Sequence, residues 1–313
     1  MGGTPPSSQP WPELPYEQFA PTMHLLHMGL QMVGKLTLLK PFEPQWANVV
    51  LGLTSRGLTT GPIPWDGGTF TVGADFRAHE LGVSTSWGTT GGFALAPMSV
   101  AAWHDRFFTV LAEAGVAATI NEKPQEVADP VRFPADTAPR PYDQALVEAW
   151  FQALHSSASV MQRYRACFTA KTPPIGFMWG TFDLRDVRLG GTTVLPAGAN
   201  AGYIRRNAMN EDQVEAGWWP GSPAYPRAAY YSFTHPQPPG IEAADLRPDA
   251  ARWDSDLGEF ILDYDDVRAT SDPEATLLEF LDSTYAAGAR KAGWDPAWIC
   301  PGRPEPAPER EAI

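Results

Sequence analysis

The sequence predicts an α+β fold in which antiparallel sheets are flanked by helices. Three observations support this class: apolar residues at helical spacing near both ends, short apolar runs separated by turn residues, and a second set of the same elements after residue 141. The repetition predicts an internal duplication of a helix-sheet-helix unit. Chance similarity between two α+β segments is the competing explanation.

The first half is predicted to begin with a helix over 16–35 and to continue as a meander of short strands. A strand is expected around Trp46, and others at 49–53, 58–64, 69–76, 79–85 and 93–95. Ser99 is the expected N-cap of a helix that Gly115 ends. A further strand is predicted at 116–120.

Residues 121–141 are rich in proline, which cannot donate ladder hydrogen bonds, and are predicted to connect a first repeat, 11–120, with a second, 142–299, packed on it. The second repeat has helices at 143–168 and 273–292 and strands at 175–184, 228–233 and 260–264. Residues 1–10 and 300–313 are predicted to be disordered tails because their composition favours no burial.

The composition argues against nucleic-acid-binding, membrane, secreted and disulfide-rich proteins. The net charge of -13 and the scarcity of dense Lys/Arg runs argue against nucleic acid or an anionic membrane as partner. Apolar runs are too short for a membrane helix and the first residues do not form a secretion signal, so we expect a cytoplasmic protein. Two cysteines, Cys167 and Cys300, exclude a disulfide framework and a cysteine-rich zinc site, leaving at most one bridge.

The common catalytic and cofactor motifs are missing from the sequence. Residues 29–35 fit the spacing G-x-x-x-x-G-K of a phosphate loop, but the segment reads as helix and Leu36 stands where Ser or Thr would bind magnesium. G-x-S-x-G, H-E-x-x-H, C-x-x-C and G-x-G-x-x-G do not occur. We therefore expect no cofactor.

Three polar features are the candidate catalytic groups. His27, Gln31 and Lys35 share one helix face, either to reach a ligand or as a hydrogen-bonding stripe. His79 follows Asp75 by four residues on an expected strand, where a carboxylate orients a general base, unless the placement is chance. Asp183 lies in an aromatic run and needs a fixed donor, which we expect to be Arg185, Arg188 or a backbone amide.

Twelve tryptophans are more than a small core requires, and such a surplus lines an apolar pocket, forms a contact surface or packs in the core. The expected lining of a pocket between the two halves comprises Trp46, Trp179, Trp218 and Tyr231. Gln31 and Lys35 are the polar groups expected beside the substrate.

Several segments carry a family resemblance: 11–14, the His27 helix, 56–60, Phe76 with His79, 179–184, 219–221 and 283–294. The chain resembles a family of uncharacterised bacterial proteins, frequent in actinobacteria, catalogued as domain of unknown function 5996. The resemblance implies histidines at three positions that hold Gln45, Pro139 and Gly176 here. A family metal or acid/base cluster would then be largely dismantled in this member, or those histidines were never catalytic.

Three hypotheses follow. The first is a protein that binds a small apolar molecule between its halves, as a cofactor-independent cyclase, isomerase or hydrolase that uses His27, His79 and Asp183. The second is a non-enzymatic acidic interaction or regulatory protein. The third is a metal-dependent enzyme that uses His27 and His79. The sequence predicts neither the substrate nor the oligomeric state.

Overall fold

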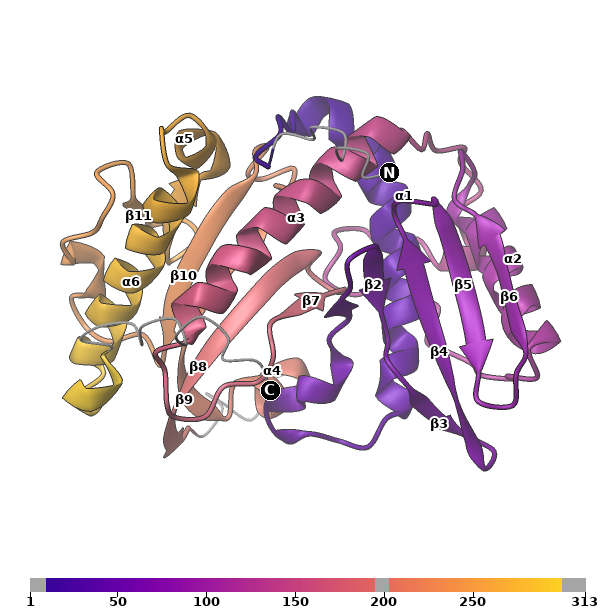
Figure 1. The fold of residues 1–313 in the computed structure, drawn as a ribbon, viewed down its shortest axis with the longest axis horizontal. Coiled ribbons are helices and arrows are strands. Elements are labelled where there is room, and N and C mark those ends of the chain that lie inside the picture. Colours follow the sequence, from indigo (N-terminus) through magenta and orange to yellow (C-terminus); the bar gives the residue numbers. More distant parts are fainter. Residues whose placement is uncertain (1–9, 195–202, 300–313) are drawn as a thin grey trace, which may run out of the picture. The chain divides into compact units, whose positions relative to one another are not determined.

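The computed structural model describes residues 10–194 and 203–299, and the chain divides into two compact units. Among these residues, unit 1 comprises 10–156, 176–185 and 218–229, and unit 2 comprises the remainder. Helices accompany two antiparallel sheets, each of six described strands, which confirms the α+β class (Figure 1). The internal duplication stays a prediction. Apart from residue 10, the predicted tails lie outside the described residues.

Unit 1 begins with α1, Tyr16–Lys35, whose bounds are those predicted from its periodicity. The first sheet has the order β1-β2-β4-β5-β6, with β3 also paired to β4. Its strands are β1 (Gly52–Leu53), β2 (Gly57–Thr59), β3 (Ile63–Trp65), β4 (Gly68–Asp75), β5 (Glu80–Thr85) and β6 (Thr90–Ala94). Helix α2, Val100–Glu113, follows the predicted cap, since Ser99 Oγ accepts from the Ala102 amide at 3.1 Å.

The first sheet has one buried and one open face. Along β4, Phe70, Val72 and Ala74 are buried, whereas the residues between them retain solvent contact. The open face carries mainly Gly, Thr and Ser and borders a shallow hollow of about 470 Å³. The apolar side chains therefore bury one face of this sheet, and small polar residues remain on the other.

Unit 2 contains most of the second sheet, whose order is β11-β12-β10-β9-β8-β7. Helix α3 (Gln144–Arg165) begins in unit 1, as do β7 (Gly176–Met178) and β8 (Asp183–Thr193). The later elements are α4 (Tyr203–Ala208), β9 (Glu211–Trp219), β10 (Ala229–His235), β11 (Arg252–Asp254), β12 (Glu259–Asp263), α5 (Tyr264–Arg268) and α6 (Pro273–Lys291). Short 3-10 helices occur at Leu36–Leu39, Pro44–Val49, Phe133–Ala135, Ile241–Ala243 and Pro296–Trp298.

A buried arginine organises the core of unit 2. The Arg188 guanidinium lies 3.6 Å from the ring centroid of Tyr164 and 4.0 Å from that of Tyr285, and it donates to the Tyr164 carbonyl at 2.6 Å. Stacking on aromatic rings lets the planar cation enter an apolar core.

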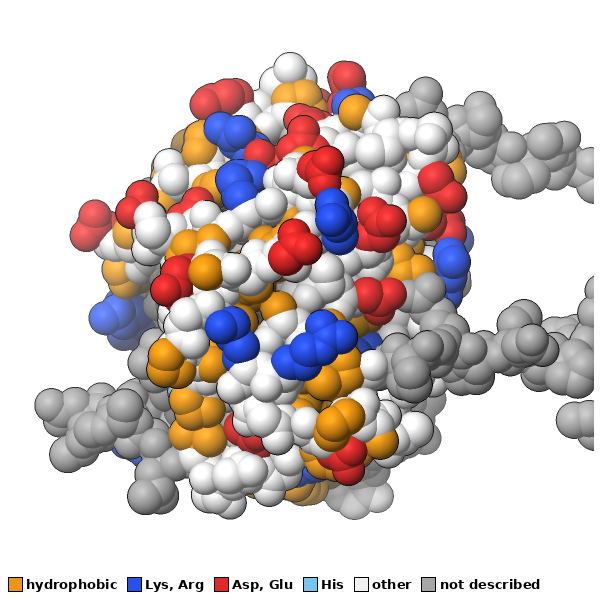
Figure 2. Space-filling model, turned by 90° about the vertical axis from the view of Figure 1, so that its left-hand side faces the viewer, with side chains coloured by type: hydrophobic (Ala, Val, Ile, Leu, Met, Phe, Trp, Pro, Cys, Tyr) orange, Lys and Arg blue, Asp and Glu red, His pale blue; other side chains and the backbone are white. Residues whose placement is uncertain are grey.

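On the side where α5 and α6 lie, Figure 2 shows acidic and basic side chains interspersed with scattered apolar groups. In the described parts of the chain, each helix is too short or too polar to cross a bilayer.

Two strand predictions are wrong throughout, and two more are wrong in extent, since 58–64 divides into β2 and β3 and 175–184 into β7 and β8. Trp46 lies in the 3-10 segment that starts at Pro44, with a left-handed φ of 57°, so no strand forms there. Residues 116–120 are irregular, because Gly115 (φ 81°) ends α2 and turns the Val116 amide back to the Leu111 carbonyl. The predicted connector at 121–141 lies inside unit 1, where contacts with α1 hold its first residues.

Candidate functional site

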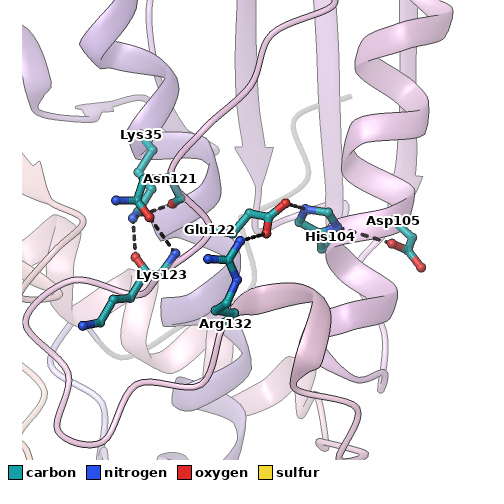
Figure 3. Close-up of polar contacts among 7 residues, drawn as sticks. All are labelled: Lys35, His104, Asp105, Asn121, Glu122, Lys123 and Arg132. Carbon is teal, nitrogen blue, oxygen red and sulfur yellow. Dashed lines mark hydrogen bonds and ion pairs between the residues drawn. The ribbon is translucent and has the colours of Figure 1, made fainter.

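The polar stripe of α1 consists of His27, Gln31 and Lys35, spaced four residues apart on one helix face. The Lys35 ammonium donates to the backbone carbonyls of Asn121, at 2.8 Å, and Lys123, at 2.6 Å, as Figure 3 shows. Burial lowers the pKa of Lys35 to about 8, which leaves it mostly cationic at neutral pH. The stripe therefore begins by fixing a loop, which we call the 121–126 loop.

Gln31 binds the same loop through two hydrogen bonds that fix the orientation of its amide. Gln31 Nε2 donates to the Gln125 carbonyl at 2.8 Å, and Gln31 Oε1 accepts from the Gln125 amide at 2.8 Å. This reciprocal pair satisfies both backbone groups of Gln125. Two side chains of α1 thus hold both ends of a loop that has no regular secondary structure of its own.

His27 binds a second segment, residues 179–183, which we call the 179–183 turn. His27 Nε2 lies 2.9 Å from the Gly180 carbonyl oxygen, which can only accept, so Nε2 carries the proton. Gln31 Nε2 lies 3.4 Å from the same oxygen. Burial is the main cause that lowers the pKa of His27 to about 4, and the ring is therefore neutral at pH 7.

Aromatic packing fixes the 179–183 turn from the other side. The Trp179 ring lies directly over Gly34 of α1, and its Nε1 donates to the Val49 carbonyl at 2.7 Å. Phe182 has a left-handed φ of 64° and stacks on Trp150, with ring centroids 5.2 Å apart. A non-glycine residue in this region is strained, so the surrounding contacts hold the turn in its conformation.

The two held segments carry two carboxyl groups, those of Glu126 and Asp183, whose charges interact. Asp183 is 6% exposed and accepts a hydrogen bond from the Thr181 hydroxyl. Glu126 is exposed as a residue, yet its carboxyl lies over Gly180, where an added Cβ would meet Glu126 Oε2 at 2.9 Å. Partial desolvation, followed by the negative charge of Asp183, raises the pKa of Glu126 above its ordinary value.

A second set of ion pairs anchors the 121–126 loop farther from α1 (Figure 3). Glu122 Oε2 accepts from Arg132 at 2.6 Å, and Glu122 Oε1 lies 3.8 Å from Nε2 of His104 on α2. Both pairs are partly exposed and contribute little energy individually. They position the start of the 121–126 loop, because the pair with His104 connects it to α2.

Sequence reasoning missed Glu126. Its segment reads as an irregular, proline-rich connector, and it has no motif or periodicity that would single out one carboxyl. The available signal was indirect: a helix stripe of three hydrogen-bonding residues has to find partners once it is buried. Those partners are backbone groups of residues 121–125 and of Gly180, rather than a ligand.

His79 belongs to a separate group, and its predicted pairing with Asp75 is wrong. Residues 76–79 form the turn between β4 and β5, so the two side chains do not share a strand face. Asp75 instead accepts from Arg56 at 2.5 Å, whereas His79 Nδ1 lies 3.1 Å from the Tyr142 hydroxyl. The Nε2 of His79 lies 3.3 Å from Glu148 Oε1. The structure thus places the two predicted histidines in different hydrogen-bond networks.

For Asp183 the sequence predicted a fixed donor such as Arg185, Arg188 or a backbone amide, and the structure adds a donor from the turn itself. Arg188 lies five residues along β8, on the opposite face of the strand, and donates to Tyr164 in unit 2. The Thr181 hydroxyl donates a hydrogen bond to Asp183. Because Thr181 is only two residues from Asp183, the conformation of the turn alone brings the two side chains into contact.

The aromatic residues expected to line a pocket are interior. Their exposed fractions are 6% for Trp46, 4% for Trp179, 0% for Trp218 and 6% for Tyr231. The Trp179 ring packs on Gly34 and donates a hydrogen bond to the Val49 carbonyl. Tyr231 belongs to unit 2, where its hydroxyl lies 3.4 Å from Glu215. The geometry of Trp179 is that of a core residue, the alternative which the sequence had left open.

The three positions where the resemblance implies histidines show whether this chain could place metal ligands there. Gln45 is buried with a left-handed φ of 54°, and Pro139 is exposed. Gly176 packs so closely that an added Cβ would lie 2.6 Å from Val50 Cβ, so this chain has no room there for a histidine. In the described residues, three or more His, Cys, Asp or Glu side chains do not converge on a point where they could hold a metal ion. The structure therefore gives the metal-enzyme hypothesis no support.

Acidification is expected to weaken the fold through His27. Its pKa is about 4 in the folded chain, below the ordinary value near 6.5, so the unfolded chain binds the proton first. Stability from this group is present above about pH 6.5 and is lost as the pH falls towards 4. Because His27 as a residue is only partly buried, we expect a loss of about 1–3 kcal/mol. Urea unfolding across this pH range should show a shallower decline for His27→Gln, and equal declines would contradict the assignment.

Comparison with protein-family models matches residues 11–300 to one family, described as a family of unknown function. The match includes α1, the 121–126 loop and the 179–183 turn. Searches of curated proteins and of solved structures found no match.

Proposed function

The chain belongs to the family of unknown function DUF5996, and we propose that it is a cofactor-independent acid/base enzyme acting on a small molecule. Glu126 is the proton donor and Asp183 the ionised partner. The observation that carries the proposal is that Glu126, an exposed residue whose carboxyl lies over Gly180, feels the charge of the buried Asp183, and that both lie on segments held by the same helix. Paired carboxyl groups in unequal environments take opposite acid and base roles.

The unequal environments supply the chemistry. The raised pKa keeps a larger fraction of Glu126 protonated than an ordinary glutamate at the same pH, as a proton donor requires. Asp183, with a hydrogen bond from Thr181, accepts a proton or stabilises positive charge that develops on the substrate. Hydrolysis, isomerisation or cyclisation of a small apolar molecule requires no more than such a positioned pair.

The α1 stripe then has a positioning role. His27, Gln31 and Lys35 form hydrogen bonds with backbone groups of the 121–126 loop and the 179–183 turn. These bonds hold the two segments at the separation at which the charges of Glu126 and Asp183 interact. Preorganisation of this kind lowers the cost of reaching the reactive geometry. A neutral His27 also adds no positive charge, which would otherwise lower the pKa of Glu126.

Two substitutions and one matched control test the proposal. Glu126→Gln and Asp183→Asn are expected to reduce turnover by roughly 10²- to 10⁴-fold, the usual contribution of a general acid or base. Asp129→Asn is the control, because Asp129 is an exposed acid on the same irregular segment and also has a positive φ. The substrates to screen are small aryl esters, epoxides and enolisable ketones, whose turnover is followed by NMR.

The coupling between the carboxyl groups can be measured without a substrate. The carboxyl carbon of Glu126 is expected to titrate above the ordinary value near 4.3, and Asp183→Asn should lower its pKa by removing a negative charge. The protonated form stabilises the fold below the ordinary pKa, and this contribution is lost as the pH rises through the raised value. An ordinary titration that Asp183→Asn leaves unchanged would remove the basis of the proposal.

The alternative of an acidic interaction or regulatory protein predicts different results. In that case the Glu126 and Asp183 variants and the Asp129 control behave alike in every turnover assay.

A further inference from the structure

Strand β6 ends the first sheet and has backbone groups available for another strand. Among the described residues it pairs with β5 and with no strand on its other side. All its residues are exposed except Phe93, which is partly buried. Natural sheet edges are usually protected by lysine, proline or a bulge. The sequence Thr90-Gly91-Gly92-Phe93-Ala94 has neither lysine nor proline, and its pairing with β5 runs through Ala94 without a bulge.

The hydrogen-bond pattern shows which groups point outwards. The Leu95 amide donates to the His79 carbonyl at 2.7 Å, and the Thr85 amide donates to the Thr89 carbonyl at 3.0 Å. Odd-numbered residues of β6 therefore face β5 in the antiparallel ladder. The N–H and C=O groups of Thr90, Gly92 and Ala94 point away from it.

We propose that this edge pairs antiparallel with β6 of a second copy of the chain, about a two-fold axis through Gly92. In that register the outward residues meet as hydrogen-bonded pairs: Gly92 with its own equivalent, Thr90 with the second copy's Ala94, and Ala94 with the second copy's Thr90. Every outward donor then has an acceptor. The edge is self-complementary because its three outward residues are symmetric about Gly92.

The side chains support a second copy over an arbitrary peptide strand. Phe93 packs edge-on against Trp103 of α2, with ring centroids 5.8 Å apart, and stands opposite the second copy's Gly91 in the proposed register. Gly91 is exposed and has no side chain to cover its backbone. An aromatic ring across from an edge glycine shields the hydrogen bonds on either side of it. Each copy supplies one phenylalanine and one glycine to this arrangement.

Gly92 lies at the centre of the edge, where the backbone has no room for a side chain. A Cβ at this position would lie 2.5 Å from the Leu81 carbonyl oxygen, so the backbone conformation there requires glycine. Substitution of Gly92 would disturb the fold itself and is a poor test. Thr90 and Ala94 are suitable positions, since both are exposed and lie on the open face of the sheet.

A charge-exchange experiment tests both the edge and its register. The double variant Thr90→Lys/Ala94→Lys places lysines directly opposite each other in two pairs and is expected to lower association at least tenfold. The matched variant Thr90→Glu/Ala94→Lys places opposite charges in the same pairs and is expected to retain or strengthen association. Within one chain the two positions are four residues apart on a strand, so they interact weakly with each other.

Sedimentation over a range of concentrations provides the measurement. A small interface of this kind gives a weak dimer, so the mass of the wild-type chain should rise from 34.1 kDa towards twice that value as concentration increases. Hydrogen exchange should show concentration-dependent protection at the amides of Thr90, Gly92 and Ala94. A mass of 34.1 kDa throughout overturns the proposal, as does equal association of the two double variants, which would locate the contact elsewhere. Far-UV circular dichroism confirms that both variants fold.

Discussion

Gly34→Ala is expected to destabilise the chain by about 3 kcal/mol or more, although alanine is the better helix former. An alanine Cβ at this position would lie 2.0 Å from Cγ and 2.2 Å from Cδ1 of Trp179. The indole cannot retreat freely, because its Nε1 is bound to the Val49 carbonyl at 2.7 Å. Helix propensity alone predicts stabilisation by about 1 kcal/mol, so the sign of the effect separates the two explanations.

Urea unfolding of four variants measures this effect: Gly34→Ala, Trp179→Leu, the double variant and a control. Gly82→Ala is the control, because the nearest atom to its added Cβ is the Gly91 carbonyl oxygen at 3.8 Å, an ordinary contact. Combining Gly34→Ala with Trp179→Leu should cost less than the sum of the two single changes, since the smaller side chain relieves the overlap. A Gly34→Ala chain as stable as the wild type would show that Trp179 does not pack on α1.

Trp150→Ala is expected to cost about 3–5 kcal/mol and to loosen the candidate site. Trp150 is fully buried at the centre of an aromatic cluster in unit 1. Its ring lies 5.2 Å from the centroids of Phe76 and Phe182 and 5.7 Å from that of Phe177. These rings come from the β4–β5 turn, β7 and the 179–183 turn, so removal of the indole leaves a cavity that all three segments share.

The control for this change is Trp87→Ala. Trp87 is 45% exposed, in the turn between β5 and β6, and its removal should cost about 1 kcal/mol or less. The functional consequence of Trp150→Ala is a second readout: with Phe182 unsupported, the pKa of Glu126 should return towards its ordinary value. If Trp150→Ala lowers stability but leaves that pKa raised, the aromatic cluster supports the fold without positioning the carboxyl pair.

The sequence predicted most of the helices well because their signals are local. The bounds of α1 follow from apolar spacing over its own 20 residues, and those of α2 from a serine cap and a terminal glycine. Strands were predicted less well. Residues 116–120 and the segment around Trp46 have apolar character suited to strands, but neither has a neighbouring strand to complete a ladder. Strand propensity depends on such context.

The candidate site depended on contacts that no local pattern encodes. Gln31 and Gln125 are 94 residues apart in sequence, and His27 and Gly180 are 153 apart. The sequence showed that α1 presents a polar stripe, and Asp183 stood out as a charge in an aromatic run. It could not show that the stripe binds backbone groups or that the charge of Asp183 acts on Glu126.

The sequence by itself thus determined the α+β class, the principal helices and the polar character of one face of α1. Only the tertiary structure decided the partners of that face and the identity of the carboxyl pair. Periodicity and capping arise from hydrogen bonds between residues three or four positions apart, which a single segment specifies. The approach of two irregular segments is determined by the packing around them, here the rings of Trp179, Phe182 and Trp150.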